Sequence, residues 1–367
     1  MEQWKEYKLG DISNMKYGKL PPKQNNGSYP IWSGYRNVGF ATTYNCRKGT
    51  IIVVARGVGG TGDVKISSED CFLTNLSIAV ELDNKICEPL YFYYKYKLSN
   101  LRYLDTGSAQ SQITIDDLKR LSLKLPPLEE QKRITEILSS IDYKIELNRR
   151  INDNLEQQAQ ALFDHYFDSG SIYLEDSIMG CLTDIAVYLN GLAMQKFPAT
   201  DIERSLPVLK IKELGQRKCD DCSDRCSDSI DADYIIDNED IIFSWSGTLM
   251  VDVWCGGKCG LNQHLFKVTP LKNYPRWFVY YWTNRHLKKF KLIAKDKAVT
   301  MGHIRRGELE NAEVAIPTNL NMLEINARIN PLFQSIIDRR LEITKLENIR
   351  DALLPKLMSG ELTINEI

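Results

Sequence analysis

The chain repeats its own order of segments, and this duplication limits its fold more than any single motif. Two stretches, 125–167 and 316–360, place apolar side chains at three- and four-residue steps with polar side chains between them, which is the period of an amphipathic helix. Roughly 40 residues at 1.5 Å each would form a rod of ~60 Å. A rod with one apolar face needs a partner, and the nearest partner is the other rod.

The ends of the two rods follow from proline and glycine. Pro126 and Pro127 suit a helix start, and no glycine or proline interrupts the first rod before Gly170. The apolar series of the second rod includes Leu323. Because Pro331 lies within this series, we expect the proline to kink the helix or to delay its start to about that position.

The segments that precede the rods also correspond, in the same order. The pairs are LGDI (9–12) with LTDI (182–185), IIVVARG (51–57) with IIFSWSG (241–247), CFLTNLSIAVEL (71–82) with CGLNQHLFKVTP (259–270), EPLYFYYKYKL (88–98) with YPRWFVYYWTNRHL (274–287), and ITIDDLKRLSLKLP (113–126) with IRRGELENAEVAIP (304–317). The third pair alternates apolar and polar residues, which predicts half-buried strands, and the fourth predicts an aromatic-rich helix in each copy. The plan is therefore globular module, rod, globular module, rod.

Composition is compatible with this plan and excludes little else. A chain of 367 residues is long enough for two domains, and its 47 basic and 48 acidic side chains nearly cancel, so a nucleic-acid-binding face must be local. The N-terminus has no apolar signal region, and no stretch approaches the roughly 18 apolar residues that span a bilayer. We expect a cytoplasmic protein with no membrane partner, whose nine cysteines are reduced thiols.

Three stretches carry a resemblance to a known family: GSAQSQITIDDLKRLSLKLPPLEEQKRI (107–134), IRDALLPKLMSGEL (349–362), and DIIFSWSGTL with GLNQHLFKV (240–268). On these residues and their order, the whole chain resembles the DNA-specificity subunits of type I restriction-modification systems. One departure is that the second rod reads IPTNLNMLEI where the first has Pro-Pro-x-x-x-Gln, which leaves the docking surface of the second rod open.

The duplication and the resemblance together predict an α+β fold with two globular target-recognition domains separated by two long antiparallel coiled-coil helices. The predicted parts are target-recognition domain 1 (1–125), a central spacer helix (126–170), target-recognition domain 2 (171–316) and a C-terminal spacer helix (317–367). The resemblance implies that each domain reads one half of an asymmetric bipartite site in double-stranded DNA. It also implies that the helices set the spacing and dock methyltransferase subunits, and that a restriction/translocase subunit joins the full complex.

The same resemblance, with the motifs that are missing, predicts a non-catalytic subunit. The sequence contains no Asn/Asp-Pro-Pro-Tyr tetrapeptide, no phosphate loop with Gly-Lys-Ser/Thr and no His-Glu-x-x-His. We therefore expect no cofactor on this chain and S-adenosylmethionine, ATP and magnesium on partner subunits.

The glycines of ARGVGGTGDVKI (55–66) raise an alternative. Gly57, Gly59 and Gly62 have the G-x-G-x-x-G spacing of a dinucleotide site, which requires that the turn open a helix. The residues that follow instead alternate like strands, and the second module retains only Gly247. We favour a glycine-rich turn between strands over a nucleotide-using enzyme.

Candidate DNA contacts come from a basic segment and from loop residues with fixed donors and acceptors. The segment 285–306 holds eight basic residues against Asp296, and could neutralise phosphates or simply form a solvated helix face. Its members are Arg285, Lys288, Lys289, Lys291, Lys295, Lys297, Arg305 and Arg306. The loop candidates are Arg56, Ser108, Gln110, Ser111 and Gln112 in the first module, and Trp245, Ser246, Thr248, Asn262, Gln263, His264, Thr300 and His303 in the second. Each could instead serve the structure of its loop, Gln263 and His264 in particular.

Two further alternatives stay open. Cys219, Cys222, Cys226, Cys255 and Cys259 make a zinc site arithmetically available, but the first module has no counterpart, so we favour free thiols. The alternative to a specificity subunit is a coiled-coil adaptor that organises proteins without reading DNA sequence.

Overall fold

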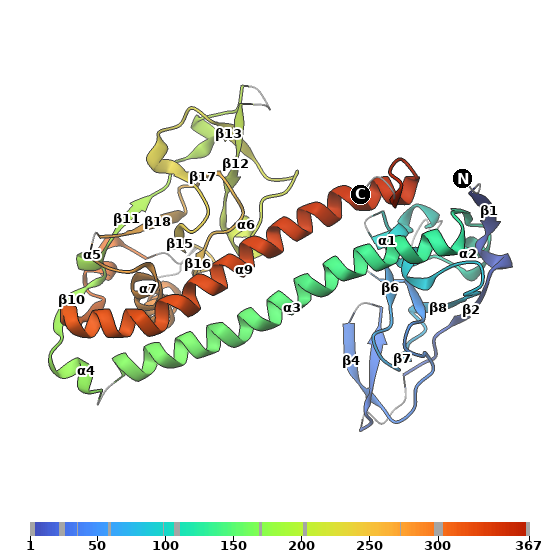
Figure 1. Cartoon of the computed structure of the whole chain (residues 1–367), viewed down its shortest axis with the longest axis horizontal. Helices are drawn as coiled ribbons and strands as arrows, with labels where there is room; N and C mark the ends of the chain where they lie inside the picture. The colour runs from blue at the N-terminus through green and yellow to red at the C-terminus, as the bar shows by residue number, and fades with distance from the viewer. Residues whose placement is uncertain are drawn as a thin grey trace. The chain divides into compact units, whose positions relative to one another are not determined.

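The computed structural model divides the chain into two compact units. Unit 1 consists of Met1–Tyr143 and Glu347–Ile367, and unit 2 of Lys144–Leu346. Figure 1 labels the elements along the chain. The structure describes residues 4–21, 26–34, 36–57, 60–97, 99–105, 111–168, 171–200, 204–271, 273–296 and 304–364.

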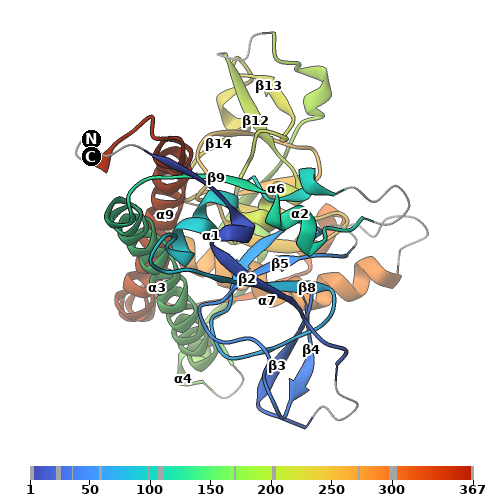
Figure 2. The ribbon, with the colours of Figure 1, turned by 90° about the vertical axis from the view of Figure 1, so that its right-hand side faces the viewer.

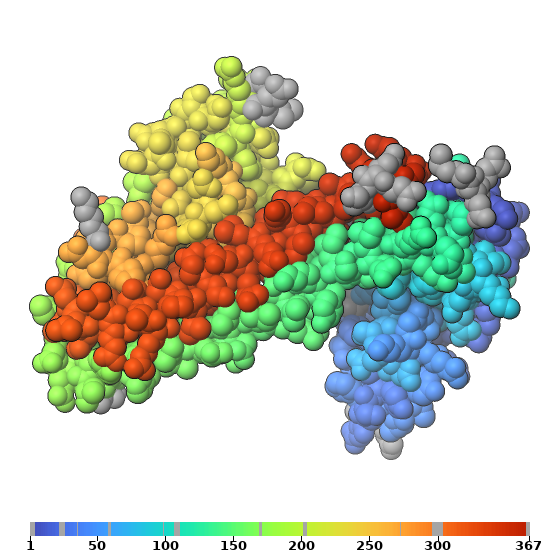
Figure 3. All heavy atoms as spheres, in the orientation of Figure 1, coloured from blue at the N-terminus to red at the C-terminus, as the bar shows by residue number. Residues whose placement is uncertain are grey.

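Each of two long helices contributes one part to unit 1 and the other part to unit 2. They are α3 (Leu128–Phe167) and α9 (Asn319–Ser359). Within unit 2, Asn148 Nδ2 donates to Glu342 Oε2 at 2.8 Å, and Asn152 Nδ2 donates to the Ile336 carbonyl at 3.4 Å. Moving forward along α3 thus means moving backward along α9, so the helices are antiparallel, as predicted. Figure 3 shows their side chains meeting along unit 2.

Of the two outcomes predicted for Pro331, a kink or a delayed start, the delayed start is wrong, because α9 already begins at Asn319. Ile325 and Ile329 are fully buried in the unit 2 core, and this packing holds the turns before the proline. The ribbon of α9 does change direction in its N-terminal part (Figure 1), as a proline that removes one helical hydrogen bond would cause. Leu323, which the apolar series placed on the buried face, is 68% exposed.

Unit 1 contains one main antiparallel sheet and two smaller sheets. The main sheet has the strand order β2 (Ser13–Tyr17), β8 (Ser77–Leu82), β5 (Ile51–Val54) and β6 (Val64–Ile66). A three-stranded sheet has the order β4 (Arg36–Ala41), β3 (Tyr29–Ser33) and β7 (Phe72–Leu73), and a pair joins β1 (Lys5–Lys8) to β9 (Ser122–Leu125). The helices are η1 (Leu9–Asp11), α1 (Pro89–Lys97), η2 (Arg102–Leu104) and α2 (Ile115–Lys119). Figure 2 looks onto this unit and shows β3 and β4 beside β2, β5 and β8.

The core of unit 1 forms where α1 covers one face of the main sheet. Tyr91 and Phe92 of α1 are fully buried there, together with Leu138 of α3 and Leu357 of α9. The aromatic-rich helix predicted for this segment is confirmed. Both long helices take part in the core, so this module does not fold around its own strands alone.

Unit 2 repeats this topology. Its main sheet has the order β11 (Ala186–Asn190), β18 (Leu265–Pro270), β15 (Ile241–Ser244) and β16 (Met250–Val253). A second sheet has the order β13 (Arg225–Ser227), β12 (Ser205–Leu209), β17 (Cys259–Leu261) and β14 (Ile235–Ile236), and a pair joins β10 (Ile178–Cys181) to β19 (Glu313–Ile316). The helices are α4 (Ile172–Glu175), α5 (Leu182–Ile185), η3 (Met194–Lys196), α6 (Ile211–Gln216), η4 (Ala232–Tyr234), α7 (Arg276–Asp296) and α8 (Arg306–Glu310).

Aromatic packing dominates the core of unit 2. Trp282 of α7 meets Phe163 and Phe167 of α3 edge to face at centroid distances of 5.5 and 5.4 Å. Phe333 of α9 lies 5.5 Å from Tyr280 of α7. Such pairs add roughly 0.5–1.5 kcal/mol each beyond the area that they bury. As in unit 1, the module is completed by the long helices, and the predicted α+β fold with an internal duplication is confirmed.

The prediction of half-buried strands fits β18, in which Phe266 and Val268 are buried and Thr269 is exposed, but it is wrong for β8. The segment from Cys71 forms two strands, β7 and β8, and the segment from Cys259 forms β17 and β18. β8 is buried on both faces, because Ile78 faces the α1 side of the sheet and Ala79 faces the cluster beneath Leu73. A second sheet on the far side of the main sheet removes the solvent-facing side that alternation would predict.

Candidate nucleic-acid interface

Most of the loop candidates meet at one edge of the main sheet in each unit. In unit 1, the Ile113 N–H donates to the Ala55 carbonyl at 3.0 Å, which joins the end of β5 to the segment before α2. In unit 2, the Ile304 N–H donates to the Trp245 carbonyl at 3.0 Å, which joins the end of β15 to the segment before α8. The duplication therefore places equivalent loops at equivalent edges.

Arg56 is the exposed candidate of unit 1, and its backbone pairs with that of Gln112. Asp105 holds the neighbouring segment, since it accepts a hydrogen bond from the Ser111 hydroxyl and another from the Gln112 N–H at 2.8 Å. Ser111 is thus engaged inside its own loop. Ser108 and Gln110 lie outside the described residues.

Trp245 is the centre of the unit 2 edge. Its indole Nε1–H donates to Asn190 Oδ1 at 2.9 Å, and its ring lies 6.1 Å from that of His264. Gln263 Nε2 and His264 Nε2 are 3.4 Å apart. The half-buried Gln263 and His264 therefore share a turn that a tryptophan ring flanks.

The remaining loop candidates of unit 2 differ in exposure. Ser246 and Asn262 are buried, and Asn262 Oδ1 accepts from the His264 N–H at 3.3 Å, so Asn262 shapes the turn. Thr248 is exposed beyond β15. Thr300 and His303, with Lys297 of the basic segment, lie outside the described residues.

The basic segment splits into separate groups. Arg285 is turned toward α3, where Asp168 accepts from its guanidinium, Asp164 lies 3.8 Å away and the guanidinium stands 5.5 Å from the Trp282 ring centroid. Its charge is thus compensated within the unit. The other members of the basic segment on α7 are exposed and form a solvent-facing strip: Lys288, Lys289, Lys291 and Lys295.

Two hollows lie among the candidate residues of unit 2, and one of them includes the turn that carries Gln263. One, of about 670 Å³, is lined by Trp245, Arg305 and Arg306 together with Asn190. The other, of about 630 Å³, is lined by Gln263 and His264 with Lys210, Lys212 and Arg225, among other residues. The sequence interpretation missed Asn190 and the three cations of the second hollow. These residues are far apart in the sequence, and no sequence pattern indicates that the fold brings them close to the loop candidates.

The described part of the glycine-rich stretch agrees with a turn between two strands, as favoured, and Gly59 lies outside the described residues. β5 and β6 pair in antiparallel fashion around it, and the element that follows is a strand, not a helix. Gly62 has a φ of +91°, and a Cβ there would lie 2.3 Å from the backbone nitrogen of Arg102. This glycine permits a close approach of two backbones, which is a structural reason for its place in the sequence.

Gln131, which distinguishes the first rod, acts inside unit 1. Its side chain is fully buried, accepts from the Glu88 N–H at 2.9 Å, and donates to the carbonyls of Ile86 at 3.0 Å and Pro126 at 2.8 Å. The sequence interpretation treated this motif as part of a docking surface, but the burial of Gln131 assigns it to fixing the approach to α1. Met322 stands at the corresponding place in α9 and packs against the unit 2 core.

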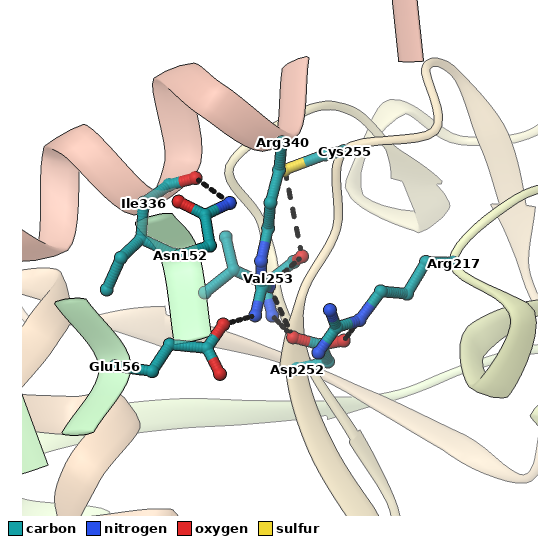
Figure 4. Close-up of polar contacts among 8 residues, drawn as sticks. All are labelled: Asn152, Glu156, Arg217, Asp252, Val253, Cys255, Ile336 and Arg340. Atoms are coloured by element: carbon teal, nitrogen blue, oxygen red, sulfur yellow. Dashed lines mark hydrogen bonds and ion pairs between the residues drawn. The ribbon is translucent and has the colours of Figure 1, made fainter. Parts of the chain in front are cut away.

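A buried ion-pair network ties the unit 2 sheet to both long helices (Figure 4). Arg340 of α9 is 8% exposed; its Nη1 donates to Asp252 of β16 at 2.6 Å, and its Nη2 donates to Glu156 of α3 at 2.7 Å. Asp252 also accepts from Arg217 Nε at 2.7 Å. Burial disfavours the guanidinium charge, but Asp252 and Glu156 outweigh it and hold the pKa of Arg340 above its ordinary value.

Unit 1 has a related junction centred on Asp142 of α3. This carboxylate accepts from Arg350 Nη1 of α9 at 2.8 Å, and from Lys97 Nζ and Tyr94 Oη of α1 at 2.9 Å each. Burial alone would raise the pKa of Asp142, but the hydrogen bonds from Arg350 and Lys97 lower it overall. In each unit, a charged junction thus fixes the module to the helix pair.

The cysteines considered for zinc do not assemble into one site in the described residues, where no three histidine, cysteine, aspartate or glutamate side chains form a metal-holding group. Cys226 and Cys259 are buried, while Cys222 is exposed. Burial raises the pKa of Cys255 to about 11, so its thiol is protonated.

Comparisons with known proteins agree with this architecture. A family model described as "Type I restriction modification DNA specificity domain" matches residues 1–157 and 179–350. The chain is 26% identical to the MjaIX specificity subunit of Methanocaldococcus jannaschii, over 99% of this chain and 89% of that one. It is 23% identical to the HindI specificity subunit of Haemophilus influenzae, over 68% and 71% of the two chains.

A solved structure shares the fold. The S subunit of a type I restriction-modification system from M. genitalium superposes with a TM-score of 0.68 at 18% identity, covering 96% of each chain. The match of the family model over most of the residues shows that the chain belongs to the type I restriction-modification DNA specificity family. Its role is therefore DNA sequence specificity, and the adaptor hypothesis is wrong. Within the described part of the chain, no helix is both long and apolar enough to cross a membrane.

Proposed function

We propose that this chain is the non-catalytic DNA-reading subunit of a type I restriction-modification complex, with target-recognition domains at 1–125 and 171–316. Each domain reads one half of an asymmetric bipartite site in double-stranded DNA. The observation that carries the proposal is that two copies of one scaffold present unlike side chains at equivalent positions of the same edge: Ala55 and Arg56 in unit 1 stand where unit 2 has Trp245 and Ser246. Identical halves would favour a symmetric target, and unlike halves favour an asymmetric one.

The catalytic chemistry belongs to other subunits in this proposal. Methyltransferase subunits dock on the spacer helices at 126–170 and 317–367, and a restriction/translocase subunit joins the full complex. S-adenosylmethionine, ATP and magnesium bind to these partners, and the complex acts in the cytoplasm. The absence of the usual methyltransferase and phosphate-loop motifs from the sequence supports this division.

The proposal is tested by mapping methylated adenines in host DNA. The chain is co-expressed with its genomic neighbours, and the methylome is compared with that of a strain lacking this chain. A bipartite motif with unlike halves that disappears with the chain is the expected result. A methylome that does not change, although a stable methyltransferase complex forms, refutes the proposal.

Helix length gives a second test. The spacer helices α3 and α9 contain 40 and 41 residues, and in this proposal their length sets the distance between the two half-sites. Inserting one heptad into both helices preserves their apolar stripe and lengthens each by about 10 Å. The preferred spacer between half-sites is expected to lengthen, and an unchanged spacer contradicts this role of the helices.

A further inference from the structure

The same tight turn links two strands in each unit. We name these the linking turns: residues 74–77 between β7 and β8, and residues 262–265 between β17 and β18. The Ser77 N–H donates to the Thr74 carbonyl at 3.1 Å, and the Leu265 N–H donates to the Asn262 carbonyl at 3.0 Å. Each turn therefore has two central residues at its tip.

Main-chain contacts on both flanks hold the unit 1 linking turn. On one side, the Gly18 N–H donates to the Ser77 carbonyl at 3.0 Å; on the other, the Ala55 N–H donates to the Leu76 carbonyl at 2.8 Å. A Cβ on Gly18 would lie 2.1 Å from the Thr74 carbonyl oxygen, so glycine is required at this close approach.

Equivalent contacts hold the unit 2 linking turn. The Gly191 N–H donates to the Leu265 carbonyl at 3.0 Å, and the Trp245 N–H donates to the His264 carbonyl at 3.4 Å. A Cβ on Gly191 would lie 2.2 Å from the Asn262 carbonyl oxygen. Both turns are thus fixed by backbone groups, so the side chains at the tips are rigidly positioned without having to hold the backbone themselves.

A carboxamide occupies the same place in both turns. Asn75 is the first tip residue in unit 1, where it is exposed, and Gln263 is the first tip residue in unit 2, where it is half-buried. A carboxamide offers a donor and an acceptor side by side, which matches the N6 and N7 atoms of adenine in the major groove. The same chemical group thus recurs in two turns whose other side chains differ, which independently indicates that the two residues have the same function.

Cations stand near each linking turn. In unit 1, the exposed Arg56 adjoins Leu76 and the exposed Lys19 adjoins Thr74. In unit 2, Arg305 and Arg306 line the hollow beside Trp245, whose N–H donates to the His264 carbonyl of the turn. The hollow that includes Gln263 and His264 is lined by three cations: Lys210, Lys212 and Arg225. Lys210 is paired with Asp224, and Lys212 lies 3.9 Å from Glu213 and 4.0 Å from Asp220, so these carboxylates offset much of the positive charge of that hollow. A tip with cations nearby suits a groove that phosphate backbones border.

We propose that the linking turns are adenine-reading elements, with Asn75 specifying one adenine–thymine pair in one half-site and Gln263 one such pair in the other. This inference rests on the proposed function, because it assigns the specificity of that function to two side chains. Each amide makes two hydrogen bonds to its adenine, and the nearby cations set the depth of the turn in the major groove. Removing one of these amides is expected to reduce discrimination at its base pair by about 10- to 100-fold.

The test uses the full methyltransferase complex containing Asn75→Ala or Gln263→Ala. Isosteric variants, Asn75→Asp and Gln263→Glu, keep the shape of the turn and remove the amide donor. Matched controls are Asn84→Ala and Asn273→Ala, which alter exposed asparagines just beyond the opposite ends of β8 and β18. Methylomes are mapped for each, and purified complexes are titrated with duplexes in which every base pair of the motif is substituted in turn.

The expected result is a flattened preference at one adenine–thymine position in one half-site for each Asn75 and Gln263 variant, with the other half-site and both controls unchanged. If a variant methylates nothing, the titration decides: a profile flattened at one position supports the inference, and a uniform loss across positions overturns it. If the Asn75 and Gln263 variants keep the wild-type base preference at every position, the inference is overturned. The proposed function still stands in that case, as long as the wild-type complex methylates a bipartite motif. A wild-type complex without a bipartite motif counts against the proposed function itself.

Discussion

Replacing Arg340 with methionine tests how firmly the unit 2 sheet is attached to the helix pair. Arg340→Met keeps most of the side-chain volume and removes the guanidinium that bonds Asp252 and Glu156. Removing one partner of a buried ion pair costs about 3–5 kcal/mol when the other charge is left alone. Here Asp252 retains Arg217, and the Glu156 side chain is 40% exposed and regains water. We therefore expect a destabilisation of about 2–3 kcal/mol, below the usual range for such pairs.

The destabilisation should appear in the thermal unfolding of unit 2. For a unit of roughly 200 residues, 2–3 kcal/mol corresponds to a Tm lower by about 5–10 °C. Intrinsic fluorescence reports this unit selectively once Trp4 and Trp32 are replaced by phenylalanine, because the other tryptophans all lie in unit 2: Trp245, Trp254, Trp277 and Trp282.

Arg328→Met is the matched control. Arg328 also lies on α9, but its pair with Glu324 at 3.3 Å is exposed, with 61% and 48% of the two side chains accessible. Exposed pairs of this kind contribute about 0–1 kcal/mol. If Arg340→Met lowers the Tm no more than Arg328→Met does, the network is not an anchor and the reasoning from burial is refuted.

Four further predictions concern the unit 1 junction, two buried positions and the basic strip. Because the pKa of Asp142 is lowered in the folded state, its contribution to the free energy of unfolding is present above about pH 4 and is lost as pH falls through the folded pKa. In urea titrations, the stability that Asp142→Asn loses at pH 7 should therefore shrink toward pH 3. A loss that stays constant with pH contradicts this prediction. Gln131→Ala leaves buried backbone groups unpaired and should cost about 1–3 kcal/mol in urea unfolding followed by circular dichroism, against a near-neutral outcome if Gln131 served only docking. Gly62→Ala should destabilise unit 1 more than Gly49→Ala, since both have positive φ but only the former places a Cβ against backbone; equal Tm values would refute the clash. The last prediction concerns the α7 lysines Lys288, Lys289, Lys291 and Lys295. Replacing them by glutamine should reduce the magnitude of the slope of log K for DNA binding against log salt concentration by about 0.9 for each phosphate that is no longer neutralised. An unchanged slope would identify a solvated helix face.

The fold was largely predictable because its signals are local. Apolar spacing and the prolines at 126 and 127 located the first long helix to within a few residues, and the order of paired segments predicted two modules of one topology. The delayed start considered for Pro331 was wrong because tertiary packing of Ile325 and Ile329 outweighs one missing hydrogen bond. The strand after Cys71 misled because a second sheet covers the face that alternation assigns to solvent.

The site was less predictable, since it depends on contacts between distant residues. Gln263 and His264 were recognised as candidates by their side-chain chemistry, whereas Asn75 was overlooked although the aligned segments place it opposite Gln263. Lys210 and Arg225 join the same hollow only through the pairing of β12 with β13 and β17. From the sequence, Gln131 was taken as part of a docking surface, and only its burial shows that it stabilises the interior of unit 1.

The linking turns have a consequence for how such a protein changes its target over generations. Their shape depends on main-chain hydrogen bonds and on glycines at positions 18 and 191, whereas the residues at the tips contribute little to that shape. Exchange of Asn75 or Gln263 for another polar residue should therefore alter which sequence is recognised while folding and subunit assembly continue as before. Two independently mutable tips on one chain multiply the targets that a lineage can sample by single substitutions, and a host can thus renew the sequence it protects without rebuilding the protein that reads it.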